Sequence, residues 1–178
     1  INRDFIADYI YAGDLLGNMW KFDVRSATPS DWSLATKRSV LFTANAGQPV
    51  TTRPIVGRHP LGGRLVYFGT GKFLEAVDNN VSGAVTQSFY AIWDQGTGAT
   101  VPRTDLLQQQ IEVIRTNADY SLRVITNNQI NWRISSSTPP SHLGWYLDLP
   151  TTGEKQITNS ILRDDRIIFT TDRPRNGA

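Results

Sequence analysis

Apolar and polar residues alternate along much of the chain with the period of a β-strand. In the segment that begins at Met19, every second residue from Trp20 to Val24 is apolar, and the residues between them are polar. This alternation is typical of a strand with one buried face, so we expect the apolar face to be the buried one. A strand at residues 9–12 precedes it across a Gly-Asn turn, and the sequence therefore predicts an antiparallel hairpin.

Further short strands are expected along the rest of the chain, separated by polar or glycine-rich turns. No segment sustains an apolar period of about 3.6 residues, and at most one helical turn is expected, at residues 105–110. The sequence therefore predicts an all-β protein. The expected strands fall into a group at residues 64–70 and 87–93, a group at 111–114, 121–126 and 130–134, and a last group at 144–149 and 166–171.

Short segments recur along the chain at a spacing that fits the blades of a propeller. The spacing is close to multiples of about 50 residues, which is typical of a blade built from short strands. We therefore expect residues 1–178 to be a single domain, a partial β-propeller of about four blades that is truncated at both ends. The similar segments are residues 10–14 with 66–70, 52–56 with 158–162, and 66–70 with 167–171, and residues 123–126 are expected to supply the copy between the last two.

Composition excludes several classes of partner. The 178 residues include 18 Lys and Arg against 16 Asp and Glu, a formal net charge of +2, and the basic residues do not cluster. We therefore expect no nucleic-acid partner. No apolar run approaches the roughly 18 residues of a membrane helix, so no membrane insertion is expected. The chain contains no cysteine, which excludes disulfides and thiolate metal sites, and it begins at Ile1, which suggests a piece of a longer protein.

Several blocks of the chain carry a family likeness. The hairpin at residues 8–23 is similar to the repeat of pyrroloquinoline-quinone-type propellers, in which a strand, a Gly-Asp turn and an aromatic strand ending in Asp recur. A more specific series resembles the C-terminal propeller of the PilY family, which includes the neisserial pilus-tip adhesins. The blocks of that series follow one another in the family's order at residues 41–75, 86–96, 106–112 and 144–174.

The resemblance implies a quinoprotein-like propeller in an exported protein, located at the cell surface, at the tip of the type IV pilus and associated with the outer membrane. It implies a non-enzymatic role in pilus biogenesis, retraction control and adhesion. The expected partners are minor pilins, a host or surface receptor and the remainder of the propeller. Two alternatives stay open: a propeller fragment of a quinoprotein dehydrogenase, and a generic protein-binding propeller.

Oxygen-bearing residues at the start of the chain form the candidate metal site. Calcium takes about 6–8 oxygen ligands, which an acidic loop supplies from alternate positions. The PilY family carries such a calcium loop, and the resemblance places Asn2, Asp4 and Asp8 at its third, fifth and ninth positions, with the carbonyl of Ile6 between. The first ligand would precede the chain, and Phe5 stands where calcium loops commonly have glycine. The alternative is a polar turn with solvated carboxylates.

The other chemically notable residues are expected to have structural roles, and no catalytic site is expected. Turn carboxylates usually accept hydrogen bonds from nearby backbone N–H groups. A histidine without a neighbouring ligand at metal-binding spacing is usually structural. The residues in question are Asp14 and Asp23 around the first hairpin, the Asp164-Asp165 pair in a hairpin turn, His59 and His142, and the Gly69–Lys72 segment in a blade turn.

Overall fold

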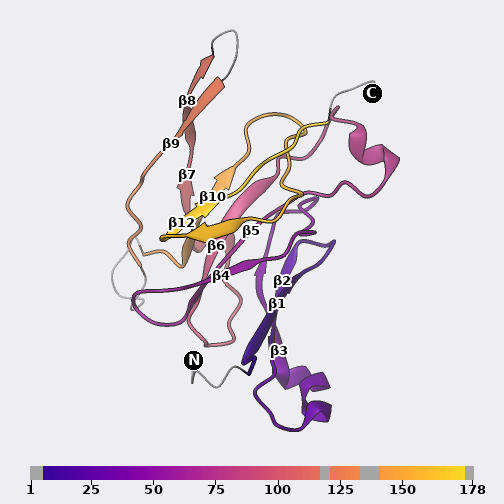
Figure 1. The fold of residues 1–178 in the computed structure, drawn as a ribbon, viewed down its shortest axis with the longest axis vertical. Helices are drawn as coiled ribbons and strands as arrows, with labels where there is room; N and C mark the ends of the chain where they lie inside the picture. Colours follow the sequence, from indigo (N-terminus) through magenta and orange to yellow (C-terminus); the bar gives the residue numbers. More distant parts are fainter. Residues whose placement is uncertain (1–5, 117–120, 133–140, 175–178) are drawn as a thin grey trace.

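The chain folds into β-sheets that are joined by loops and short 3-10 helices (Figure 1). The computed structural model describes residues 6–116, 121–132 and 141–174. Within those ranges there is no α-helix, and no helix is long and apolar enough to cross a membrane. The prediction of an all-β chain is therefore confirmed. The strands are β1 (Tyr9–Gly13), β2 (Asn18–Asp23), β3 (Arg38–Thr43), β4 (Ile55–Arg58), β5 (Arg64–Gly69), β6 (Ser88–Asp94), β7 (Leu107–Gln109), β8 (Ile111–Thr116), β9 (Ser121–Ile125), β10 (Gly144–Asp148), β11 (Ile161–Arg163) and β12 (Arg166–Ile168), and the 3-10 helices are η1 (Pro29–Ser33), η2 (Ala35–Lys37), η3 (Ala76–Asn79) and η4 (Arg103–Asp105).

The first sheet consists of β1, β2 and β3 in chain order, all antiparallel, and it confirms the predicted first hairpin. The predicted buried face of β2 is wrong. Met19 and Lys21 are buried. Trp20 and Phe22 are only half-buried, and their rings stack with centroids 6.4 Å apart. The reason is that the Lys21 ammonium pairs with the buried carboxylate of Asp94 in the second sheet. The alternation of residues within β2 cannot show a partner that comes from another sheet.

The second sheet has five strands in the order β4-β5-β6-β10-β7. Strands β4, β5 and β6 form an antiparallel meander, β10 pairs antiparallel with β6, and β7 pairs parallel with β10. The sequence grouping of residues 144–149 with residues 166–171 is therefore wrong, because β10 lies in this sheet and β12 pairs with β11. Strand β10 pairs with β6 over its whole length, and its aromatic residue Tyr146 lies opposite Tyr90. The helical turn considered at residues 105–110 is not formed, because η4 ends at Asp105 and residues 107–109 form β7.

Two further sheets are two-stranded hairpins, β8–β9 and β11–β12. The β8–β9 hairpin extends away from the rest of the chain (Figure 1). Val66 in β5 and Ile167 in β12 both lie in the second strand of an antiparallel hairpin, as the repeat predicts. Ile10 does not occupy the equivalent position, because it lies in β1, which is the first strand of its hairpin and an edge strand of its sheet. The turn of the last hairpin is Asp164-Asp165, as predicted, and both residues have left-handed φ angles, of 49° and 59°, as a tight two-residue hairpin turn requires.

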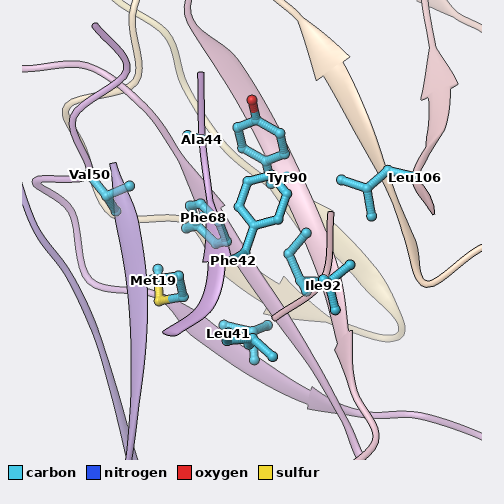
Figure 2. Close-up of a cluster of buried hydrophobic side chains, with 11 residues drawn as sticks. Met19, Leu41, Phe42, Ala44, Val50, Phe68, Tyr90, Ile92 and Leu106 are labelled. Atoms are coloured by element: carbon cyan, nitrogen blue, oxygen red, sulfur yellow. The ribbon is translucent and has the colours of Figure 1, made fainter. Parts of the chain in front are cut away.

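Apolar side chains from the first two sheets pack together as the core (Figure 2). Met19 and Phe42 come from the first sheet. Phe68 and Tyr90 come from the five-stranded sheet. The centroid of the Phe42 ring lies 4.7 Å from that of Tyr90 and 6.0 Å from that of Phe68, in tilted arrangements that aromatic pairs favour. This core fixes how the first sheet lies against the second.

Strand β6 is buried on both of its faces. All seven of its residues are buried. Tyr90 points into the core, and Phe89 and Trp93 point to the opposite side, because successive side chains alternate along a strand. There the Phe169 ring stacks on Phe89 with centroids 4.1 Å apart, and the His59 ring stacks on Trp93 at 4.0 Å. We call the side that carries Phe89 the outer face of the five-stranded sheet.

Candidate functional site

The structure describes only part of the predicted calcium loop. Asn2 and Asp4 lie outside the described residues, whereas Ile6 and Asp8 lie within them. Ile6 is exposed. The backbone carbonyl of Asp8 accepts a hydrogen bond from the Val24 N–H at 3.0 Å, so the end of the loop is attached to the first hairpin. Within the described residues no group of three or more His, Cys, Asp or Glu side chains could hold a metal ion.

The residue after Asp8 is surrounded by basic side chains. The Tyr9 ring has the Lys21 ammonium 4.5 Å and the Arg64 guanidinium 4.5 Å from its centroid, and the Arg25 guanidinium lies at 5.0 Å. Such contacts are attractive because the face of an aromatic ring carries partial negative charge. Arg64 also lies 3.9 Å from the Asp8 carboxylate. The end of the predicted calcium loop therefore faces a strongly basic corner of the molecule.

A buried cluster around Asp94 joins the first sheet to the second. The Lys21 ammonium lies 2.6 Å from one oxygen of Asp94, and the Tyr11 hydroxyl donates to that oxygen at 2.5 Å. The Gly96 N–H donates to the other oxygen at 2.8 Å. Burial alone would raise the pKa of Asp94, but the hydrogen bonds from Lys21 and Tyr11 hold that pKa below its ordinary value. We call Tyr11, Lys21 and Asp94 the Asp94 cluster.

A polar pocket of about 330 Å³ opens beside this cluster. It lies between the first sheet and the loop that follows β6. Its charged lining is mainly basic, so its chemistry suits an acidic group more than a metal cation. The charged residues that line it are Lys21, Arg25, Lys37, Arg38 and Asp23.

A second polar cluster lies at the other end of β6. Arg103 donates to both carboxylate oxygens of Asp148, at 2.8 and 3.0 Å, and its guanidinium lies 3.8 Å from the centroid of the Tyr146 ring. The Ser88 hydroxyl donates to Asp148 at 2.5 Å. These contacts connect η4, β10 and β6. The sequence gives no sign of this cluster, because its members come from separate segments and match no motif.

The two turn carboxylates of the first hairpin have the predicted structural roles. Asp14 accepts hydrogen bonds from the backbone N–H groups of Leu16 and Asn18, both at 2.9 Å, and from the Trp20 indole at 2.8 Å. Asp23 accepts from the backbone N–H of Arg25 at 3.1 Å and also from its guanidinium. Both side chains therefore fix local backbone conformation.

The two histidines also pack as structural residues. His59 is 4% exposed, and its Nδ1 accepts a hydrogen bond from the Leu61 N–H at 3.1 Å. Its Nε2 is buried and has no hydrogen-bond partner within the described residues. Burial lowers the pKa of His59, because the charged imidazolium loses its hydration. The Nδ1 of His142 accepts from the Asn131 N–H at 3.3 Å.

The prediction of a blade turn at Gly69–Lys72 is wrong. Gly69 ends β5, Gly71 forms an isolated parallel bridge with Val50, and a second segment packs against both glycines. A Cβ atom at Gly69 would lie 2.0 Å from the Gln156 side-chain oxygen, and one at Gly71 would lie 2.6 Å from the Cβ of Lys155. Only glycine allows this close approach. The glycines of this segment therefore serve packing.

Comparisons with known proteins agree with one another. The family described as "PilY1 beta-propeller domain" matches residues 1–121. The Type IV pilus biogenesis factor PilY1 of Pseudomonas aeruginosa is 32% identical to this chain over 198 residues, covering 93% of the chain and 17% of the relative. A Type IV pilus biogenesis factor PilY1 homolog of Xylella fastidiosa is 31% identical over 185 residues, covering 96% of the chain and 12% of the relative. The chain thus spans a small part of these relatives.

A solved structure is similar to the whole of the described fold. The crystal structure of the Pseudomonas aeruginosa PilY1 C-terminal domain matches with a TM-score of 0.79 and 32% sequence identity. The match covers 97% of this chain and 43% of the solved one. The predicted propeller fold is therefore confirmed.

The Asp94 cluster leads to a prediction about stability. Replacing Lys21 with Met should lower the free energy of unfolding by about 3–5 kcal/mol, because Asp94 would stay buried without its cation. Replacing Lys37 with Met is the matched control, since Lys37 contacts an acidic group only at 3.9 Å, and should change stability by no more than about 0.5 kcal/mol. Urea unfolding at neutral pH measures both. Equal stability of the two variants would contradict the role given to the Asp94 cluster.

The environment of His59 leads to a prediction about pH. Because burial lowers the pKa of His59 in the folded chain, the unfolded chain binds a proton at this residue more readily. The free energy of unfolding should therefore fall as the pH drops below about 6.5, the ordinary histidine pKa. The variant His59→Asn keeps an acceptor for the Leu61 N–H and should lose this slope between about pH 7 and pH 5.

The variant His142→Asn is the control for the pH measurement and should keep the slope. Urea unfolding at several pH values compares the two variants with the unchanged chain. If all three show the same slope, the proton uptake does not belong to His59.

Proposed function

The chain belongs to the PilY1 β-propeller family, and on that premise we propose that it is a non-enzymatic propeller module of a type IV pilus biogenesis factor. The observation that carries the proposal is the agreement of sequence and fold over nearly the whole chain, at 32% identity and a TM-score of 0.79. The module acts in pilus biogenesis and retraction control, and in adhesion. The names of the relatives favour this role over the quinoprotein dehydrogenase alternative.

The packing of the sheets supports a scaffold role. Strand β6 is buried on both faces, and polar residues at each of its ends bind residues of other elements. An arrangement fixed in this way presents its loops in constant positions, which favours binding because little conformational freedom is lost on association. The buried Asp94 pairs with Lys21 and the half-buried Asp148 pairs with Arg103, so both acids serve the scaffold.

The location and partners follow from the same relatives. We propose that the protein is exported and surface-exposed, at the pilus tip and associated with the outer membrane. Its partners are minor pilins, a receptor on a host or other surface, and the rest of the propeller. The relatives are named as type IV pilus biogenesis factors, which supports contact with the pilus machinery.

The pilus role is tested in the organism that encodes the protein. Deleting residues 1–178 from the intact protein should reduce surface pili and adhesion to the level of a strain without the gene. Pili are counted by electron microscopy, and adhesion is measured on a surface to which the parent strain attaches. An immunoblot of the exported protein controls for its level. Normal pili and adhesion with the shortened protein exported at its usual level would contradict the proposal.

We also propose that calcium binds the loop ending at Asp8, through Asn2, Asp4, Asp8 and the carbonyl of Ile6. The oxygen-bearing residues at alternate positions support it. At Asp8 the cation has to compete with Arg64, which lies 3.9 Å from the carboxylate, a distance too long for a hydrogen bond. A divalent cation can therefore compete for this carboxylate. The Asp8 carbonyl is bonded to Val24, so an ion held here would order the entry to the first hairpin.

The calcium proposal predicts that Asp8→Ala lowers calcium affinity about tenfold or more, because affinity depends on the charge and number of the ligands. Isothermal titration of the intact protein measures it. Glu112→Ala removes an exposed carboxylate outside the loop and is the matched control, with unchanged affinity expected. If calcium uptake is the same in the Asp8 variant, or absent in the unchanged protein, the loop is a solvated turn.

A further inference from the structure

A cleft of about 640 Å³ lies on the outer face of the five-stranded sheet. It is bordered by β10, by the loop that follows β9 and by the segment that contains β12. Its volume falls within the range of roughly 300–1,000 Å³ that small-molecule sites occupy. The basic pocket beside the Asp94 cluster shares no lining residue with it.

One wall of the cleft is aromatic and held in place by packing. Trp145, on β10, packs beside the buried Phe89 at 6.0 Å between centroids. Phe169 is fixed by its parallel stack on the same Phe89, with an interplanar angle of 10°. Trp132 stands edge-on against His59 at 4.3 Å. Both tryptophans are half-buried, so parts of their rings remain available to a ligand.

Other residues that line the cleft carry amide and hydroxyl groups. The loop there is held by Gln109, whose side-chain oxygen accepts hydrogen bonds from the Thr126 hydroxyl at 2.7 Å and the Asn128 N–H at 3.0 Å. Asn127 and Gln129 are exposed, and their side chains make no hydrogen bond with any residue that the structure describes. Their amides therefore offer both donors and acceptors to a ligand.

Among the described residues that line the cleft there is no Asp, Glu, Lys or Arg. An ionised ligand would lose hydration on entering without gaining a charged partner, so a neutral ligand is favoured. The amides suit hydroxyl groups, which both donate and accept hydrogen bonds. The aromatic rings suit a flat apolar C–H surface. A sugar ring has both features in one molecule.

We propose that this cleft binds a neutral oligosaccharide, with a sugar face packed on Trp145 and Trp132 and its hydroxyls bonded to Asn127 and Gln129. The proposal deepens the adhesion part of the proposed function and rests on it, because it names the chemical class of the receptor.

The test is to titrate the full chain with defined probes and to measure binding by tryptophan fluorescence and by calorimetry. The neutral probes are chitotriose, N-acetyllactosamine and maltotriose. A heparin-derived disaccharide is the charged probe, and a neutral Gly-Ser peptide is the peptide probe. We expect at least one neutral sugar to bind. Trp145→Ala should weaken its binding about tenfold, equivalent to ~1.4 kcal/mol, and Asn127→Ala should weaken it about threefold, a smaller loss because one amide is removed.

Matched controls separate the cleft from general effects. Trp32→Ala removes an exposed tryptophan on η1, and Asn79→Ala removes an exposed amide on η3. Both should bind as the unchanged chain does. Asn127 is exposed, so its variant should fold even if Trp145→Ala does not. Failure of all neutral sugars to bind, binding of the charged or peptide probe alone, or equal binding by the Asn127 variant would overturn the proposal.

Pilus counts distinguish this proposal from the pilus role. Cells that carry Asn127→Ala in the intact protein should keep the pili of the parent strain while sugar binding falls. If no sugar binds but deletion of residues 1–178 still removes the pili, the cleft proposal fails and the pilus role stands.

Discussion

The burial of both faces of strand β6 is the constraint on which the rest of the structure depends. All seven of its residues are buried. Tyr90 on one face needs the first sheet as cover, and Phe89 on the other needs the ring of Phe169. Apolar surface left in water would cost about 25 cal/mol per Å². Neither the first sheet nor the C-terminal segment can therefore separate from β6 without a large loss, and the sheets depend on one another.

Polar contacts at the ends of β6 add specificity to this apolar packing. Ser88 begins the strand and donates to Asp148, which Arg103 neutralises. Asp94 ends the strand and binds Lys21. Apolar surfaces alone allow neighbouring strands to shift, but a carboxylate that moves away from its cation loses that interaction, and the cost is greatest for the buried Asp94. The two clusters therefore fix where β6 lies along its neighbours. The Asp94 cluster also fixes the position of the basic pocket, which Lys21 lines.

The sequence was sufficient where the determining contacts are local. The all-β class, the Asp164-Asp165 turn and the role of Asp14 all follow from residues that are close in the chain. The buried face of β2 could not be predicted, because Lys21 is buried only through Asp94 in another sheet. The pairing of β10 with β6 and β7 is also long-range, and local periodicity does not encode it.

The candidate sites show the same division. The calcium ligands were proposed from local spacing and family likeness, and Asn2 and Asp4 lie outside the described residues. The cleft on the outer face of the five-stranded sheet has no sequence motif, because its walls come from distant segments that meet only in the folded chain.

The measurement that tests the dependence on β6 most directly is native-state hydrogen exchange of single amides at increasing denaturant. The account predicts that amides of β2 and β6 open with the same free energy, that of global unfolding. Amides of β2 that open at a clearly lower free energy while β6 stays protected would contradict it.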